Sequence, residues 1–260
     1  GNPKTRSDGS IRTKKIKQKE LQIKYDWVGF KKYKRVINDQ EYQDAAKFTF
    51  IYVIVSVVIE IILGLFLAFL FNRRIYGRGF MRSLMILPIF ATPFAIGFMF
   101  FTILFEISGP LAWMGIPFLS NHNWAPFSVM LVDIWQWTPF CFLVFLAALQ
   151  GIPDDLIEAA TLDTKSAYKI WTSVILPLLQ PIIVLVILLR VAESAKLYDY
   201  IASLTKGGPG TATQSVSFLV FNKAFKMNDF GYASAGSFLM LIVVMVFVML
   251  FFTRLRKTYE

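Results

Sequence analysis

The stretch that decides the fold is Phe48–Phe71, FTFIYVIVSVVIEIILGLFLAFLF, in which Glu60 is the only charged residue. A helix that crosses about 30 Å of hydrocarbon needs roughly 20 mostly apolar residues, and this stretch is long enough. Four more stretches have the same character: Ser83–Phe105, Ala125–Leu149, Val174–Leu189 and Phe230–Phe252. The sequence therefore predicts an all-α membrane protein, a polytopic helical bundle with five spans in this chain.

The composition of the 260-residue chain supports a membrane protein. Hydrophobic residues make up 56% of it and charged residues only 17%, with a mean hydropathy of +0.55. A soluble domain carries roughly 25% charged residues, so one or two soluble domains are disfavoured. The single cysteine, Cys141, and the single histidine, His122, exclude a disulfide framework and a cysteine- or histidine-rich metal site. We predict no metal site and no catalytic residue.

Positive charge is concentrated at the N-terminus and in particular loops. Residues 1–47 hold 13 Lys and Arg against 6 Asp and Glu, a net charge of +7. In short loops, Lys and Arg mark the cytoplasmic side of a membrane protein. The bases in loops 72–82 and 150–173 and in the C-terminal tail therefore predict a cytoplasmic C-terminus.

With five spans, the same alternation leaves residues 1–47 outside, as a basic polar extracytoplasmic segment before a transmembrane domain at 48–258. A free basic tail of this length resists translocation. We therefore expect a further span before residue 1, and the alternative is a five-span protein with an unusual N-terminus. A basic segment can bind nucleic acid or anionic lipid. We favour a solvated segment beside the lipid bilayer and predict no nucleic-acid partner.

A second informative stretch is residues 152–164, IPDDLIEAATLDT. Pro153 suits the first position of a helix, where its missing N–H is harmless. Asp154 and Asp155 suit the first turn, where the helix dipole favours anions. We expect a short amphipathic helix on the cytoplasmic face. A helix that rests on lipid usually carries Lys and Arg on its polar face, so this acidic helix is better suited to docking on a protein.

Glu158-Ala159-Ala160, followed at the matching spacing by Leu176-Pro177, resembles the EAA loop of binding-protein-dependent ABC importer permeases. Thr164 stands where that family has glycine, and Val174 stands where it has isoleucine. Glycine lets the chain turn with a positive φ, so we expect a differently shaped turn at Thr164. Other stretches resemble carbohydrate permeases such as those of the maltose and glycerol-3-phosphate importers, and together the resemblance covers residues 27–258. These stretches include Gly77–Arg82, Leu197–Tyr200, Leu204–Gly210 and Gly231–Ala235.

The resemblance implies a type I ABC importer permease, the transmembrane subunit of an ATP-driven importer in a prokaryotic cell membrane. It implies a second, different permease subunit with which this chain forms an alternating-access pathway. It also implies two cytoplasmic ATPase subunits, which bind ATP and Mg²⁺, and an extracytoplasmic solute-binding protein that delivers a sugar, oligosaccharide or polyol. The chain itself is then neither an enzyme nor the holder of a cofactor, and it has no phosphate-binding Gly-Lys-Ser/Thr loop.

In this family the loop at 150–173 couples the permease to the ATPase. The coupling residues implied here are Asp155, Glu158, Ala159, Ala160, Asp163 and Thr164. Glu158 would face positive charge on the ATPase. The alternative interpretation of Glu158 is an ordinary glutamate on a helix surface.

Charged residues inside a span are costly and usually functional. We expect the helix that contains Val174 to continue through Arg190, Glu193 and Lys196, which share a face, and Arg190 can pair with Glu193. These residues either line the pathway and contact sugar hydroxyls, or form an internal ion pair that holds spans together. Arg190, Lys196 and the basic outer segment also give weak support for an acidic saccharide.

Aromatic side chains in the span at 125–149 either stack on sugar rings or pack against other spans. By resemblance to maltose permeases, the sugar site lies on the spans that flank the coupling loop. The pathway residues predicted on these grounds are Trp135, Trp137, Phe140, Arg190, Glu193, Ser194 and Leu197. Glu60 is expected to make a helix–helix contact, and Asp133 to orient polar groups.

One alternative from another class of function is an ion-coupled secondary carrier that uses Glu60, Arg190 and Glu193 as a relay. Such a carrier would transport its solute without an ATPase. A membrane-bound enzyme is disfavoured, because the sequence has a single histidine and no clustered nucleophiles.

Overall fold

A computed structural model describes residues 29–72 and 77–259, and within that part the chain is helical with no strand. The expected all-α fold is confirmed. The α-helices are α1 (Lys31–Ile37), α2 (Gln40–Asn72), α3 (Arg78–Phe90), α4 (Pro93–Leu104), α5 (Trp124–Gln150), α6 (Asp154–Asp163), α7 (Ala167–Ile170), α8 (Leu176–Ser194), α9 (Val216–Phe221) and α10 (Phe230–Tyr259). Short 3₁₀ or π segments lie at Ala112–Met114, Trp171–Ile175, Ile201–Thr205 and Asn222–Lys226.

Among the described residues, four helices are long and apolar enough to cross a membrane. They correspond to the expected spans that begin at Phe48, Ala125, Val174 and Phe230. The span expected at Ser83–Phe105 is instead the pair α3 and α4, bent by 101°. The bend falls where Thr92 takes an extended conformation before Pro93, because a residue that precedes proline is pushed out of the helical region. The described part of the chain therefore has up to five helical segments of spanning length and composition, if the bent pair counts as one.

The core of the bundle forms where α2 packs against α5 and α8. The helices α2 and α5 approach so closely at Gly64 that an added Cβ would lie 2.6 Å from Cys141 Cβ. Tyr52, Phe142 and Phe145 are buried at this interface. In contrast, α10 leaves most of its apolar surface exposed, and only 11% of its most apolar 18-residue stretch is buried. A long apolar face of this kind is covered by lipid or by another membrane helix.

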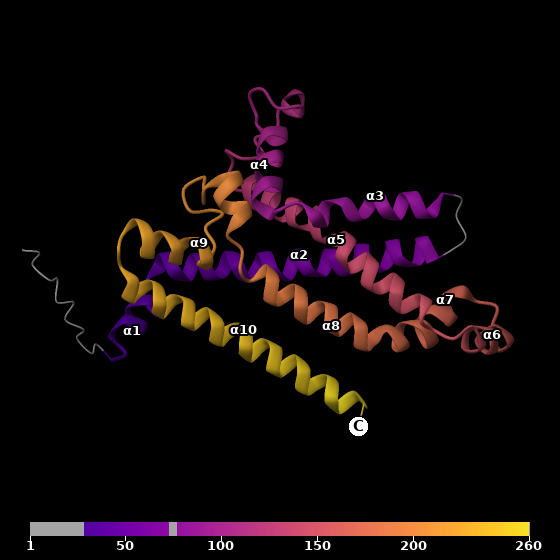
Figure 1. Ribbon diagram of the computed structural model, residues 1–260. Coiled ribbons are helices and arrows are strands. Elements are labelled where there is room, and N and C mark those ends of the chain that lie inside the picture. The colour runs from indigo at the N-terminus through magenta and orange to yellow at the C-terminus, as the bar shows by residue number, and fades with distance from the viewer. Residues whose placement is uncertain (1–28, 73–76, 260) are drawn as a thin grey trace, which may run out of the picture.

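The two ends of the bundle differ (Figure 1). At one end α6 and α7 lie beyond the C-terminal end of α2, and at the other end lie α1, α9 and the start of α10. The helix α8 ends at Ser194, so the expectation that it continues through Lys196 is wrong. The N–H groups of Lys196 and Leu197 already make i→i−3 turns there. Residues 1–28 of the basic segment, and Arg73 and Arg74 of the loop at 72–82, lie outside the described residues.

Asp229, just before α10, holds α1 in place at one end of the bundle. Its carboxylate accepts hydrogen bonds from Lys32 Nζ at 3.0 Å, Arg35 Nη1 at 2.9 Å and the N–H of Tyr232 at 3.0 Å. The hydrogen bond from Lys32 is the main reason why the pKa of Asp229 lies below its ordinary value of 3.8. A group whose pKa is lowered by folding stabilises the folded state when the pH is above its ordinary pKa. This stabilisation is lost as the pH falls through the lowered pKa.

We therefore expect acid to release α1 from α10. Hydrogen–deuterium exchange of residues 31–37 should be slow at neutral pH and should accelerate as the pH falls below about 3.8, after correction for intrinsic exchange. The Asp229→Asn variant should already exchange quickly at neutral pH, whereas Asp44→Asn, which changes an exposed carboxylate on α2, should match the parent. Equal protection of α1 in both variants would show that Asp229 does not hold it.

Candidate functional site

The helix α6 protrudes from one end of the bundle and has no buried residue. Asp154 and Asp155 lie in its first turn, and Pro153 is its N-cap, one position earlier than expected. Leu156 is 46% exposed and Leu162 is 89% exposed. An isolated ten-residue helix is marginal in water. The structure leaves α6 uncovered, with acidic and apolar side chains exposed.

Thr164 ends α6 in an extended conformation, with φ −153° and ψ 139°. No positive φ is needed there, so threonine can replace glycine without backbone strain. Its hydroxyl accepts a hydrogen bond from the N–H of Ser166 at 3.3 Å, and Ser166 in turn caps α7 by accepting from the N–H of Lys169. The turn at Thr164 therefore forms in an extended conformation and is held by hydroxyl groups.

The other predicted coupling residues share the exposed surface of α6. Asp155, Glu158, Ala159 and Asp163 are exposed, and Ala160 is half-buried. Among the described residues, no hydrogen bond or ion pair engages the Glu158 carboxylate. An unpaired carboxylate on an exposed helix can form an ion pair with a basic side chain of another protein.

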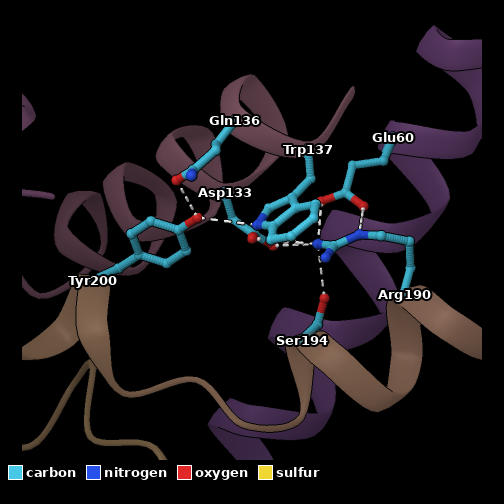
Figure 2. Close-up of polar contacts among 7 residues, drawn as sticks. All are labelled: Glu60, Asp133, Gln136, Trp137, Arg190, Ser194 and Tyr200. Atoms are coloured by element: carbon cyan, nitrogen blue, oxygen red, sulfur yellow. Dashed lines mark hydrogen bonds and ion pairs between the residues drawn. The ribbon is translucent and has the colours of Figure 1, made fainter. Parts of the chain in front are cut away.

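A second candidate site is a buried polar cluster around Arg190 (Figure 2). Arg190 Nε donates to Glu60 Oε2 at 2.6 Å, and its Nη2 donates to Glu60 Oε1 at 2.9 Å. Nη2 also lies 3.3 Å from both Asp133 carboxylate oxygens and 2.9 Å from Ser194 Oγ. The guanidinium lies over the Trp137 ring, 4.6 Å from its centroid. One arginine on α8 thus connects α2, α5 and α8, and its side chain is 1% exposed.

These contacts correct one expectation and confirm another. Arg190 pairs with Glu60 and Asp133, whereas Glu193 pairs with Lys196 at 2.9 Å near the surface. The expected helix–helix contact of Glu60 is confirmed. Buried charges must be paired because their desolvation is costly, and two carboxylates from other helices satisfy this need better than one exposed glutamate a turn away.

A second tier of hydrogen bonds joins this cluster to the bend between α3 and α4. The Tyr200 hydroxyl donates to Gln136 Oε1 at 2.6 Å and accepts from Trp137 Nε1 at 3.1 Å. Gln136 Nε2 donates to the carbonyl oxygen of Ala91 at 2.9 Å, where α3 ends. A side chain of α5 thereby donates a hydrogen bond to a backbone carbonyl that the bend leaves without a helical partner, as membrane helices require.

Next to this cluster lies a cavity of about 180 Å³, here named the Arg190 pocket. Five of the seven predicted pathway residues line it: Trp137, Arg190, Glu193, Ser194 and Leu197. Its other walls include Tyr52, Asp133, Lys196, Tyr198, Asp199 and Tyr200. Phe140 does not line the pocket but contacts the Trp137 ring edge-on. Trp135 is 43% exposed and packs against Phe100 of α4 in a groove lined by α2, α3, α4 and α5.

Sequence reasoning missed two members of this site. Tyr52 and Tyr200 look like ordinary aromatic residues of a membrane protein. The available signal was Glu60, because a lone carboxylate in an apolar span requires a cationic partner on another span.

Three comparisons place the chain among known proteins. Residues 60–260 match the family described as "Binding-protein-dependent transport system inner membrane component". The trehalose/maltose transport system permease protein of Thermococcus litoralis is 36% identical over 233 residues, which cover 86% of this chain and 78% of that protein. The multiple sugar-binding transport system permease protein of Streptococcus mutans is 30% identical over 246 residues, 92% of this chain and 84% of that one.

A solved structure has the same fold. It is a bacterial ABC transporter involved in the import of the acidic polysaccharide alginate, and a chain of it superposes with a TM-score of 0.81 at 22% identity. The match covers 91% of this chain and 86% of that chain.

Proposed function

Because this chain belongs to the family of binding-protein-dependent transport system inner membrane components, we propose that it is one of two permease subunits of an ATP-driven carbohydrate importer. Membership of this family excludes the ion-coupled secondary carrier, and it means that the chain is a transport subunit and not an enzyme. In the proposed complex the second permease is a different chain. Two ATPase subunits hold ATP and Mg²⁺, and a solute-binding protein delivers a sugar, oligosaccharide or polyol.

The observation that carries this proposal is the exposed acidic helix α6. The bases in loops 72–82 and 150–173 support a cytoplasmic position for α6 and for the C-terminus in the inner membrane of a prokaryote. There α6 inserts into a cleft of an ATPase subunit, with Glu158 facing a cation and Leu162 covered. Closure of the two ATPase subunits moves both coupling helices, and the spans then alternate between inward- and outward-open arrangements.

The Arg190 pocket is this chain's part of the solute pathway. The aromatic side chains of Trp137 and Tyr200 offer apolar surfaces to sugar rings, and the hydroxyl and carboxylate groups around them offer hydrogen-bond partners. The ion pairs of Arg190 with Glu60 and Asp133 hold this wall rigid. The similarity to trehalose/maltose and multiple-sugar transport permeases supports a carbohydrate as the solute.

Reconstitution tests the proposed function. The complete transporter in proteoliposomes should take up radiolabelled solute only when ATP is on the α6 side and the binding protein on the opposite side. A proton ionophore should not change the rate. Uptake driven by an ion gradient in the absence of ATP would contradict the proposal.

A further inference from the structure

We propose that the Arg190 pocket admits uncharged polyhydroxylated solutes and excludes acidic ones. The inference rests on the proposed function, because it assumes that the pocket lies on the transport pathway. It reverses the expectation of an acidic saccharide that Arg190 and Lys196 suggest in the sequence alone.

Both bases that line the pocket are already paired with carboxylates of the protein. Arg190 gives two hydrogen bonds to Glu60, and its Nη2 is shared further with Asp133 and Ser194. Lys196 pairs with Glu193 at 2.9 Å. A carboxylate or phosphate on a solute would have to compete with these partners, and at Arg190 that would leave a buried carboxylate of the protein unpaired.

The acids that line the pocket outnumber the bases. Asp133, Glu193 and Asp199 face Arg190 and Lys196 there, and Glu60 lies directly behind Arg190. The Asp199 side chain is exposed and has no hydrogen bond or ion pair within the described part of the chain. Its carboxylate repels an anionic solute but accepts hydrogen bonds from hydroxyl groups.

The Arg190 side chain also has one donor without a partner. Arg190 Nη1 is buried and makes no hydrogen bond with any described residue. Because Nη1 has no surface open to the pocket, Arg190 offers a solute anion no free hydrogen-bond donor. A pocket with paired bases and the free acceptor Asp199 fits a neutral sugar or polyol, whose hydroxyl groups can donate to that carboxylate.

Binding to the complete transporter in nanodiscs, without the solute-binding protein, tests this inference. Suitable probes are the methyl glycosides of glucose, galactose and mannose, each compared with the methyl uronide of the same sugar. Each pair differs only in a carboxylate at C6. We expect saturation-transfer NMR to detect at least one neutral glycoside, and its uronide to bind at least roughly tenfold more weakly.

The variant Asp199→Asn isolates the contribution of this chain from that of the second permease. Asp199→Asn should reduce the ratio of glycoside affinity to uronide affinity severalfold, whereas Asp44→Asn should leave this ratio unchanged. The inference is overturned if a uronide binds as well as its neutral partner or if no neutral glycoside binds. It is also overturned if Asp199→Asn leaves the affinity ratio unchanged. ATPase activity of the same preparation, and its loss in Glu158→Lys, reports separately on the importer assignment.

Discussion

Replacing Glu158 by lysine will abolish ATP-driven uptake while the protein still inserts into the membrane. The side chain is exposed on α6 and makes no ion pair within the described chain, so the substitution leaves the fold intact. At the proposed ATPase interface it places two cations in contact. Loss of a buried interfacial charge pair costs about 2–5 kcal/mol, and each 1.4 kcal/mol is about a tenfold change. Docking should therefore weaken at least roughly 30-fold.

The experiment measures ATP-dependent uptake, ATPase stimulation by the binding protein and the amount of inserted chain for each variant. Asp44→Lys is the matched control, because it makes the same change of charge at an exposed acid on α2 whose ion-pair partner is the neighbouring Lys47. The control should transport normally. Undiminished uptake by Glu158→Lys would remove its proposed role and leave it as an ordinary surface glutamate.

Replacing Arg190 by methionine will destabilise the bundle strongly. The substitution leaves Glu60 and Asp133 buried without their cation. Removing one partner of a buried ion pair costs about 3–5 kcal/mol, which lowers the thermal midpoint of a chain of this size by on the order of 10 °C. Fluorescence-detected unfolding of the purified transporter measures this shift.

Replacing Arg190 and its two carboxylate partners by neutral residues distinguishes a structural role of Arg190 from a role in the solute pathway. The triple variant Arg190→Met, Glu60→Gln, Asp133→Asn removes all three charges together, and we expect it to recover most of the thermal stability. If Arg190 also contacts the solute, the recovered protein will still take up solute poorly. Full recovery of uptake would limit Arg190 to holding helices together, and failure to recover stability would show that the ion pairs are not the cause of the loss.

The sequence predicted those features that depend on local pattern. The length of each apolar run determines whether a helix can cross the bilayer, so the spans of α2, α5, α8 and α10 could be predicted from hydropathy. The acidic first turn and Pro153 are likewise local signals for the start of α6. The bend at Thr92 was harder to predict, because Pro88 lies inside α3 without ending it, and the sequence does not say which proline breaks the span.

The pairing of charges could not be predicted from local pattern. Arg190 and Glu193 are close in sequence, yet Arg190 pairs with Glu60, which lies 130 residues earlier. Which helix faces supply the partners depends on how α2 and α5 cross, and the close approach at Gly64 that sets this crossing has no local signature. The position of Trp135 outside the Arg190 pocket also follows from helix rotation, which places it on a different face from Trp137.

Cross-linking at Leu162 tests most directly the claim that α6 docks on an ATPase subunit. Leu162 is 89% exposed, and the one native cysteine, Cys141, can be replaced by serine, so that Leu162→Cys carries the only thiol. In the assembled transporter we expect this thiol to cross-link to the ATPase subunit and to resist a membrane-impermeant maleimide until the ATPases are stripped off. A thiol that stays open to the reagent with the ATPases bound, or that cross-links only to lipid, would contradict the account.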